Sequence, residues 1–218
     1  TCWDKDGKKE SEGYYKDDRL DGKKTWWHKN GQKKEEGYFK NNIRDGEFTC
    51  WDKDGKKESE GYYKDDKLDG KKTWWHKNGQ KKEEGIYKND KLDGKFTEWY
   101  KNGQKQSVYF YENDELNSIQ TNWSKDGYKE SESHFNNDKL NGRQTSWYKN
   151  GKKLIEYNLT DDKLDGKWTE WYEDGQKEVE GNYKNGKLEG KVNGWDENGQ
   201  IREESYYIGS KRDGKYIE

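Results

Sequence analysis

The stretch GKKTWWHKNGQKKEEGYFKNNIRD, residues 22–45, contains one complete unit of the pattern that decides the fold. It runs through strand-forming residues to His28, turns at Lys29-Asn30-Gly31, and returns through a second strand from about Gln32 to Lys40. Residues Asn41 to Gly46 are predicted to be the loop that leads to the next hairpin. Polar residues followed by glycine are typical of a type I turn with glycine in the left-handed position. In a hairpin this turn forms a three-residue loop with a bulge. The unit is therefore predicted to be a β-hairpin.

The turn fixes a predicted register with three cross-strand pairs: His28 with Gln32, Trp27 with Lys33, and Thr25 with Glu35. Because side chains alternate along a strand, this register places one set of residues on the same face: Trp27, Thr25, Gly37 and Phe39. Lys24 and Glu36 then pair on the other face. A two-residue Asn-Gly loop would instead place Trp27 opposite Lys34. We favour the first register because it gathers the apolar columns together.

The pattern recurs every 24 residues along the chain of 218 residues. A tryptophan column keeps this spacing without an insertion: Trp3, Trp27, Trp51, Trp75, Trp99, Trp123, Trp147, Trp171 and Trp195. Glycine, leucine and aromatic columns stay in phase with it, and residues 1–18 recur identically at 49–66. A fixed period indicates a repeat array in which each unit buries apolar residues against its neighbours. We predict that the tryptophan column is the structural core of this array.

These patterns predict an all-β fold, an elongated and twisted antiparallel single-sheet solenoid of stacked 24-residue β-hairpins. Residues 1–218 are predicted to form a single repeat domain of about nine repeats, the N-terminal one partial. About 17 or 18 strands would extend roughly 80–85 Å at about 4.8 Å per strand. The middle units, from about Gln104 to Asp161, are the least regular, and Ser118 replaces the loop glycine there.

The units resemble membrane occupation and recognition nexus (MORN) repeats. The resemblance rests on Tyr63-x4-Leu68-Asp69-Gly70-x4-Trp75-x3-Gly79 and on the next unit from Tyr87 to Gly103. Gly166 to Gly175, followed by Tyr183 to Gly190, is most similar to the second, bacterial type of the repeat, and the resemblance extends over all 218 residues. It implies a sheet of stacked hairpins that acts as a scaffold, a protein-binding or lipid-associating module, an antitoxin-like protein or a surface protein. It implies no catalytic residues.

Composition excludes several classes of protein. Only 25% of the residues are hydrophobic and 41% are charged, whereas 16% are aromatic, which argues against a disordered chain. The 44 basic and 46 acidic residues alternate and leave a net charge of −2, so no nucleic-acid patch is expected. No apolar run is long enough for a transmembrane helix.

No constellation of catalytic or metal-ligating residues emerges. His28, His76 and His134 are far apart in the array and form no triad or metal motif. Cys2 and Cys50 occupy equivalent positions about 19 Å apart, which is too far for a disulfide. We therefore predict no enzyme activity, no cofactor, no metal and no small-molecule substrate.

Aromatic residues outside the regular columns are the candidate partner-binding residues: Trp26, Trp74, Tyr100, Tyr148 and Tyr172. Trp26 and Trp74 are predicted to lie on the face opposite the tryptophan column, and the tyrosines flank the turns. Aromatic residues among charged ones suit protein interfaces. We expect them to bind a protein partner or a second copy of the chain.

Three functions remain open at this stage. The first is a binding or scaffold protein. The second is an antitoxin or immunity protein, whose nearest acidic patch would be Glu112, Asp114 and Glu115. The third is a surface protein that binds cell-wall glycan or lipid head groups. The Lys-, Asp- and Asn-rich composition without proline favours a bacterial origin, and the missing methionine favours a secreted or cell-surface location over the cytoplasm.

Overall fold

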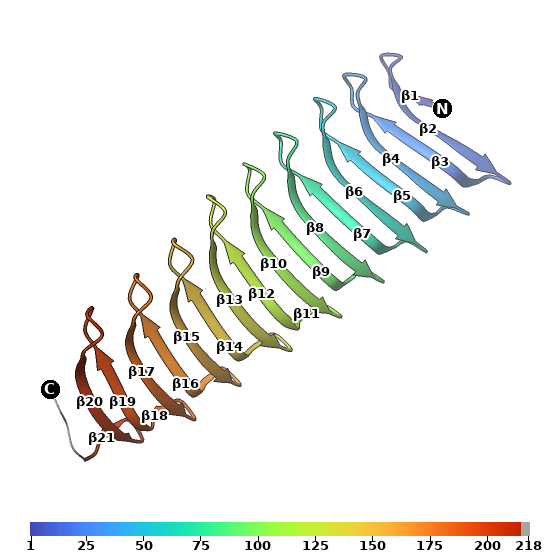
Figure 1. The fold of residues 1–218 in the computed structure, drawn as a ribbon. Coiled ribbons are helices and arrows are strands. Elements are labelled where there is room, and N and C mark those ends of the chain that lie inside the picture. Colours follow the sequence, from blue (N-terminus) through green and yellow to red (C-terminus); the bar gives the residue numbers. More distant parts are fainter. Residues whose placement is uncertain (215–218) are drawn as a thin grey trace. The chain divides into compact units, whose positions relative to one another are not determined.

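The computed structural model describes residues 1–214, and every regular element in that range is a β-strand. The strands divide into two compact units, which are described separately. The first comprises Thr1–Gln104 and Tyr111–Asp114, and the second comprises Lys105–Phe110 and the described residues from Glu115 onward. The described range contains no helix with the length and apolar character to span a membrane. The predicted all-β array of antiparallel hairpins is confirmed (Figure 1).

In the first unit, successive strands pair antiparallel in chain order. They are β1 (Cys2–Trp3), β2 (Lys9–Lys16), β3 (Arg19–Trp27), β4 (Lys33–Lys40), β5 (Ile43–Trp51), β6 (Lys57–Lys64), β7 (Lys67–Trp75), β8 (Lys81–Lys88) and β9 (Lys91–Trp99). Figure 1 shows these ribbons as a single layer.

The second unit repeats this arrangement. It contains most of β10 (Lys105–Glu112), then β11 (Glu115–Leu116), β12 (Ser118–Trp123), β13 (Lys129–Asn136), β14 (Lys139–Trp147), β15 (Lys153–Thr160), β16 (Lys163–Trp171), β17 (Lys177–Lys184), β18 (Lys187–Leu188), β19 (Gly190–Trp195), β20 (Ile201–Ile208) and β21 (Lys211–Arg212). Short breaks separate β11 from β12 and β18 from β19 at positions where other repeats have one continuous strand. Ser118 has a φ of 95° where most repeats have glycine.

The turn after each column tryptophan has the geometry that the sequence predicts. Gly31 has a φ of 88°, its N–H donates to the His28 carbonyl at 2.9 Å, and the His28 N–H donates to the Gln32 carbonyl at 2.8 Å. The predicted left-handed glycine and the His28–Gln32 pairing are therefore confirmed.

The turn at the other end of each hairpin is tighter than the sequence analysis implied. Asn41 and Asn42 both have positive φ, 50° and 70°, and β5 begins at once with Ile43. Two consecutive residues with positive φ define a type I′ turn, which asparagine, aspartate and glycine tolerate best. Residues 41–46 are thus a two-residue turn and the start of a strand, and not a six-residue loop.

The predicted register fails two residues beyond the turn. Trp27 pairs with Lys33 as expected, but a β-bulge follows, and Trp26 then pairs with Glu35. Lys34 is the extra residue, so every pair beyond it shifts by one. Thr25 consequently faces Glu36, and Lys24 faces Gly37. The predicted Thr25–Glu35 and Lys24–Glu36 pairs are wrong.

This shift separates two faces that the sequence analysis had merged. The aromatic face of the first unit contains Lys24, Trp26, Phe39, Phe48, Tyr63, Lys72, Trp74 and Tyr87, with Leu20 and Leu68. The lysine–glutamate face contains the tryptophan column, the Thr25 and Glu36 columns and the lysines beside them. Trp27 and Thr25 therefore do not share a face with Gly37 and Phe39. In the second unit the equivalent aromatic face contains Tyr157, Leu159, Leu164, Trp168 and Tyr183.

The buried core does not follow the tryptophan column. The least exposed apolar residues are Leu20, Phe48, Leu68, Val108, Leu159 and Val192. All but Val108 lie on the aromatic face. The tryptophans of the column are half-buried, and Trp3 is 61% exposed. The column forms a regular ladder on the lysine–glutamate face, where it is packed under polar side chains, and the prediction that it is the core is corrected accordingly.

Candidate functional site

On the lysine–glutamate face each repeat satisfies its own charges. Lys33 Nζ donates to Glu36 Oε2 at 2.7 Å and lies 5.5 Å from the centroid of the Trp51 ring. Thr25 Oγ1 donates to the same carboxylate at 3.0 Å. Partial burial opposes ionisation of Glu36, but the hydrogen bonds from Lys33 and Thr25 outweigh it and lower the pKa of this carboxyl. Lysine, glutamate, threonine and tryptophan thus form a closed network.

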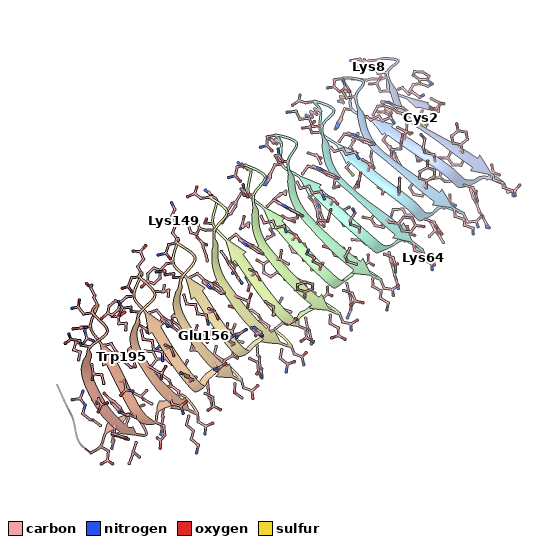
Figure 2. All side chains as sticks on the ribbon, viewed as in Figure 1. Cys2, Lys8, Lys64, Lys149, Glu156 and Trp195 are labelled. Atoms are coloured by element: carbon pink, nitrogen blue, oxygen red, sulfur yellow. The ribbon has the colours of Figure 1, made fainter. Side chains whose placement is uncertain are left out.

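The network recurs through both units. Lysine lies over the tryptophan of the following hairpin in the pairs Lys9–Trp27, Lys57–Trp75, Lys81–Trp99, Lys129–Trp147, Lys153–Trp171 and Lys177–Trp195. The same lysines bridge to the glutamate three residues later. Trp195 and Glu156, labelled in Figure 2, belong to this face. These tryptophans are therefore covered by the chain's own cations.

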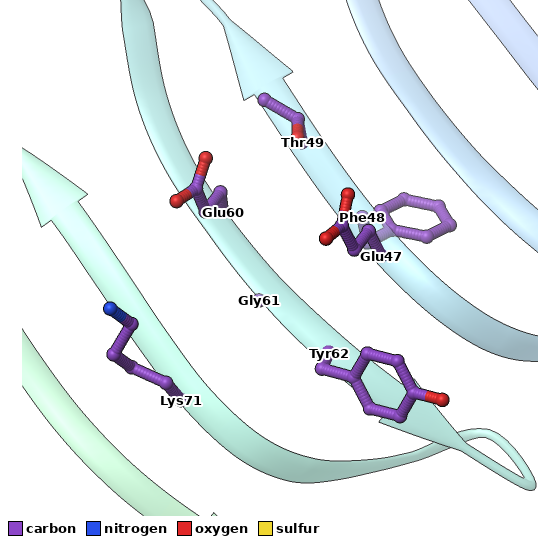
Figure 3. Close-up of a pocket in the computed structure, with 7 residues that line it drawn as sticks. All are labelled: Glu47, Phe48, Thr49, Glu60, Gly61, Tyr62 and Lys71. Atoms are coloured by element: carbon purple, nitrogen blue, oxygen red, sulfur yellow. The ribbon is translucent and has the colours of Figure 1, made fainter.

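A hollow of about 210 Å³ also opens on β5, β6 and β7 (Figure 3). Its lining residues are Glu47, Phe48, Thr49, Glu60, Gly61, Tyr62 and Lys71. Glu60 is already held by Lys57 at 2.5 Å. The hollow is small, and its carboxylate network belongs to the structural repeat.

The aromatic face of the first unit is a packed cluster of rings with cations seated on them. The Trp26 ring lies 6.0 Å from Phe39 and 6.3 Å from Phe48, and Phe48 lies 5.6 Å from Tyr63. Lys24 Nζ is 4.8 Å from the centroid of Trp26. Such edge-to-face and cation–π contacts fix the rings in place.

A second copy of this arrangement lies farther along the same unit. Lys72 Nζ is 5.5 Å from the centroid of Trp74, which packs 6.3 Å from Tyr87. Between the two copies, the Arg44 guanidinium lies 4.3 Å from the centroid of Tyr63. Trp26 and Trp74 thus lie on the face opposite the tryptophan column, as predicted. Their role in partner binding stays a prediction.

The candidate tyrosines serve a structural purpose that the sequence analysis missed. Tyr148 Oη donates to the Trp171 carbonyl at 2.8 Å, and Tyr172 Oη donates to the Trp195 carbonyl at 2.7 Å. His28 Nε2 makes the same contact with the Trp51 carbonyl at 2.8 Å. Burial raises the pKa of Tyr148 and of Tyr172. Histidine or tyrosine directly after the column tryptophan therefore ties one repeat to the next, and Tyr100 holds the same position.

The asparagine or aspartate of each type I′ turn makes another tie of this kind. Asp90 Oδ1 accepts a hydrogen bond from the Leu68 N–H at 2.7 Å, and Asn42 Oδ1 accepts one from the Leu20 N–H at 2.7 Å. The residues of the turn are therefore part of the stacking contact between repeats.

The remaining polar residues suggest no reaction centre. No group of three or more histidine, cysteine, aspartate or glutamate residues able to hold a metal ion occurs in residues 1–214. Cys2 is exposed and Cys50 half-buried, both as free thiols, and burial raises the pKa of Cys50.

In the second unit the aromatic face carries an open pocket of about 410 Å³. Its lining is apolar and aromatic apart from one carboxylate, and consists of Ile155, Tyr157, Leu159, Leu164, Trp168, Glu170 and Tyr183. Trp168 Nε1 donates to Glu170 Oε1 at 3.1 Å, and the Trp168 ring packs 5.9 Å from Tyr183. The residue pattern did not predict this pocket, because the positions of Trp168 and Glu170 hold different residue types in different repeats.

Comparison with known families agrees with this geometry. A family model described as MORN repeat variant matches residues 20–41, 44–65, 68–89, 92–113, 140–161, 164–185 and 188–208. The seven segments cover more than half of the chain. They omit the unit that begins near Leu116, where Ser118 replaces the loop glycine, so the match is less complete than the resemblance implied. No curated protein matches the chain.

Proposed function

The chain belongs to the MORN repeat variant family, and we propose that it is a non-enzymatic scaffold that binds a protein partner through the aromatic face of its repeats. The observation that carries this proposal is the contrast between the two faces. On the lysine–glutamate face, the lysines that lie over the column tryptophans also bridge to a glutamate, as Lys33 does with Trp51 and Glu36. On the aromatic face of the first unit, the ammonium groups of Lys24 and Lys72 lie over rings, and neither forms an ion pair with a carboxylate of residues 1–214.

The aromatic face also has the composition of a binding surface. Aromatic residues and arginine are enriched at protein interfaces because they bury much area with few rotatable bonds. In the first unit these rings are already packed edge to face, so little side-chain entropy is lost on binding. Within the first unit, no second layer of structure covers this face (Figure 1).

A pair of matched variants tests the proposal. Lys24→Glu with Lys72→Glu reverses two charges on the aromatic face, whereas Lys23→Glu with Lys71→Glu makes the same change one residue away on the lysine–glutamate face. The partner is captured from lysate and the surface fraction, identified by mass spectrometry, purified and titrated by calorimetry. We expect the first variant to weaken binding at least about tenfold and the second less than about threefold, because exposed ion pairs contribute little.

Other outcomes would replace the proposal. Equal losses in both variants would show that the aromatic face is not the binding surface. A captured protein that is toxic alone would identify the chain as an immunity protein. Concentration-dependent assembly in sedimentation velocity, with no captured partner, would assign the face to contacts between copies.

A further inference from the structure

The pocket on the aromatic face of the second unit contains two parts of a cation-binding site. The ring of Trp168 supplies an aromatic surface, and Glu170 supplies a carboxylate, with the indole N–H and Oε1 joined at 3.1 Å. That hydrogen bond fixes the carboxylate beside the ring. Glu170 also lies directly across from Ile155 on one side and Val179 on the other, so its neighbours in the sheet are apolar.

The described part of the chain supplies no cation to this pocket. Among residues 1–214, no lysine or arginine pairs with Glu170, and none lies over the Trp168 ring. The glutamates of the opposite face differ, since Glu180 bridges to Lys167 at 2.8 Å and to Lys177 at 2.6 Å. A half-buried carboxylate among apolar side chains is costly without a partner, so pairing with an external cation would stabilise it.

The repeat pattern shows what the pocket lacks. In β3 of the first unit the equivalent positions hold Lys24 and Trp26, and Lys24 Nζ lies 4.8 Å from the ring centroid. Six repeats later they hold Trp168 and Glu170, so the ring has moved to the lysine position and a carboxylate has replaced the ring. Within residues 1–214, the cation that lies over the ring in β3 therefore has no counterpart at Trp168 and Glu170 in β16.

We propose that this pocket receives an arginine side chain from a partner polypeptide, with the guanidinium stacked on Trp168 and hydrogen-bonded to Glu170. This inference rests on the proposed function and names the partner's chemistry. Arginine suits the site better than lysine because its planar group stacks on a ring and meets a carboxylate with two donors. A volume of about 410 Å³ also leaves room for a neighbouring aliphatic side chain against Leu159 and Leu164.

The test uses the whole chain labelled with ¹⁵N and a capped pentapeptide with a central arginine between two leucines. The probe is the indole N–H signal of Trp168, assigned by its disappearance in Trp168→Phe. We expect a saturable shift of this signal. The same peptide with citrulline in place of arginine keeps the shape but loses the charge, and it should bind at least about tenfold more weakly.

Two variants separate the pocket from long-range charge. Glu170→Gln keeps the size and the acceptor oxygen of the side chain and should also weaken the arginine peptide at least about tenfold. Glu156→Gln removes the same charge from the opposite face of the second unit (Figure 2) and should leave the affinity unchanged. Equal affinity for the citrulline peptide, or equal losses in the two variants, would overturn the inference. Such a failure leaves the face comparison of the proposed function undisturbed, because that test changes only residues of the first unit.

Discussion

A single methyl group added at Gly37 would disturb the packing of the aromatic face, because it would overlap the Phe48 ring. A Cβ atom there would overlap Cδ2 and Cε2 of the Phe48 ring and would lie 2.9 Å from its Cγ. Ordinary carbon contacts are about 3.5–4.0 Å. The ring is only 7% exposed and lies 5.7 Å from Phe39 and 5.6 Å from Tyr63, so it has little room to retreat. We expect Gly37→Ala to cost about 3 kcal/mol, the upper end for overpacking.

The second unit indicates how this strain can be relieved. Ser133 occupies the glycine position there and faces Gln144. Tyr157 occupies it in the next repeat and faces Trp168, as Gly37 faces Phe48. The column thus accommodates a side chain where the facing side chain leaves room for a Cβ atom, and the obstacle at Gly37 is the Phe48 ring that lies over it. Phe48→Val should therefore reduce the cost of Gly37→Ala, with a coupling free energy of at least about 1.5 kcal/mol between the two substitutions.

Urea unfolding followed by circular dichroism measures the four proteins of this double-mutant cycle. Gly79→Ala is the control, because it meets no atom within 4 Å and changes only a turn residue with a φ of 85°. It should cost about 1–2 kcal/mol and show no coupling with Phe48→Val. Additivity of Gly37→Ala and Phe48→Val to within about 0.5 kcal/mol would refute the packing argument.

Three further predictions concern the ties between and within repeats. Tyr148→Phe removes the hydrogen bond to the Trp171 carbonyl and should cost about 1 kcal/mol in urea unfolding; an unchanged midpoint would contradict its role as a tie. Because the folded pKa of Glu36 is lowered, its contribution to stability is present above about pH 4.3 and is lost as the pH falls through the folded value. Glu36→Gln should accordingly flatten the decline of the urea midpoint between about pH 6 and pH 3, and an equal slope would rule this out. Asp90→Ala should cost about 1–2 kcal/mol by freeing the Leu68 N–H, whereas Asp90→Asn should be nearly neutral, and equal losses in the two would count against the hydrogen bond.

Local sequence patterns predicted the features that depend on one turn or one period. The 24-residue spacing led to the hairpin array, and the glycine of His28-Lys-Asn-Gly31 led to the left-handed turn and its first two pairs. Both follow from local backbone requirements that few residues other than glycine meet.

The bulge at Lys34 could not be predicted in the same way. A classic bulge needs no glycine, and lysine in the bulged position has no distinguishing preference. Because the side-chain period of a strand is two, that single residue moved Thr25 and Glu36 to the face opposite Gly37 and Phe39. The type I′ turns were within reach, since paired residues such as Asn41-Asn42 are typical of them. The pocket at Trp168 and Glu170 depends on which residues the shifted register brings together, so it required the structure.

The hydrogen bonds between repeats also imply an order in which the repeats are completed during synthesis. The Leu68 N–H finds its acceptor in Asp90, and the His28 side chain finds the Trp51 carbonyl, so each repeat is completed by residues 22 or 23 positions later. During synthesis at about 5–20 residues per second, a repeat that has left the ribosome waits roughly 1–4 s for the bonds that close it. The growing chain therefore always has one unfinished hairpin at its ribosomal end, and the hairpins behind it are closed in order.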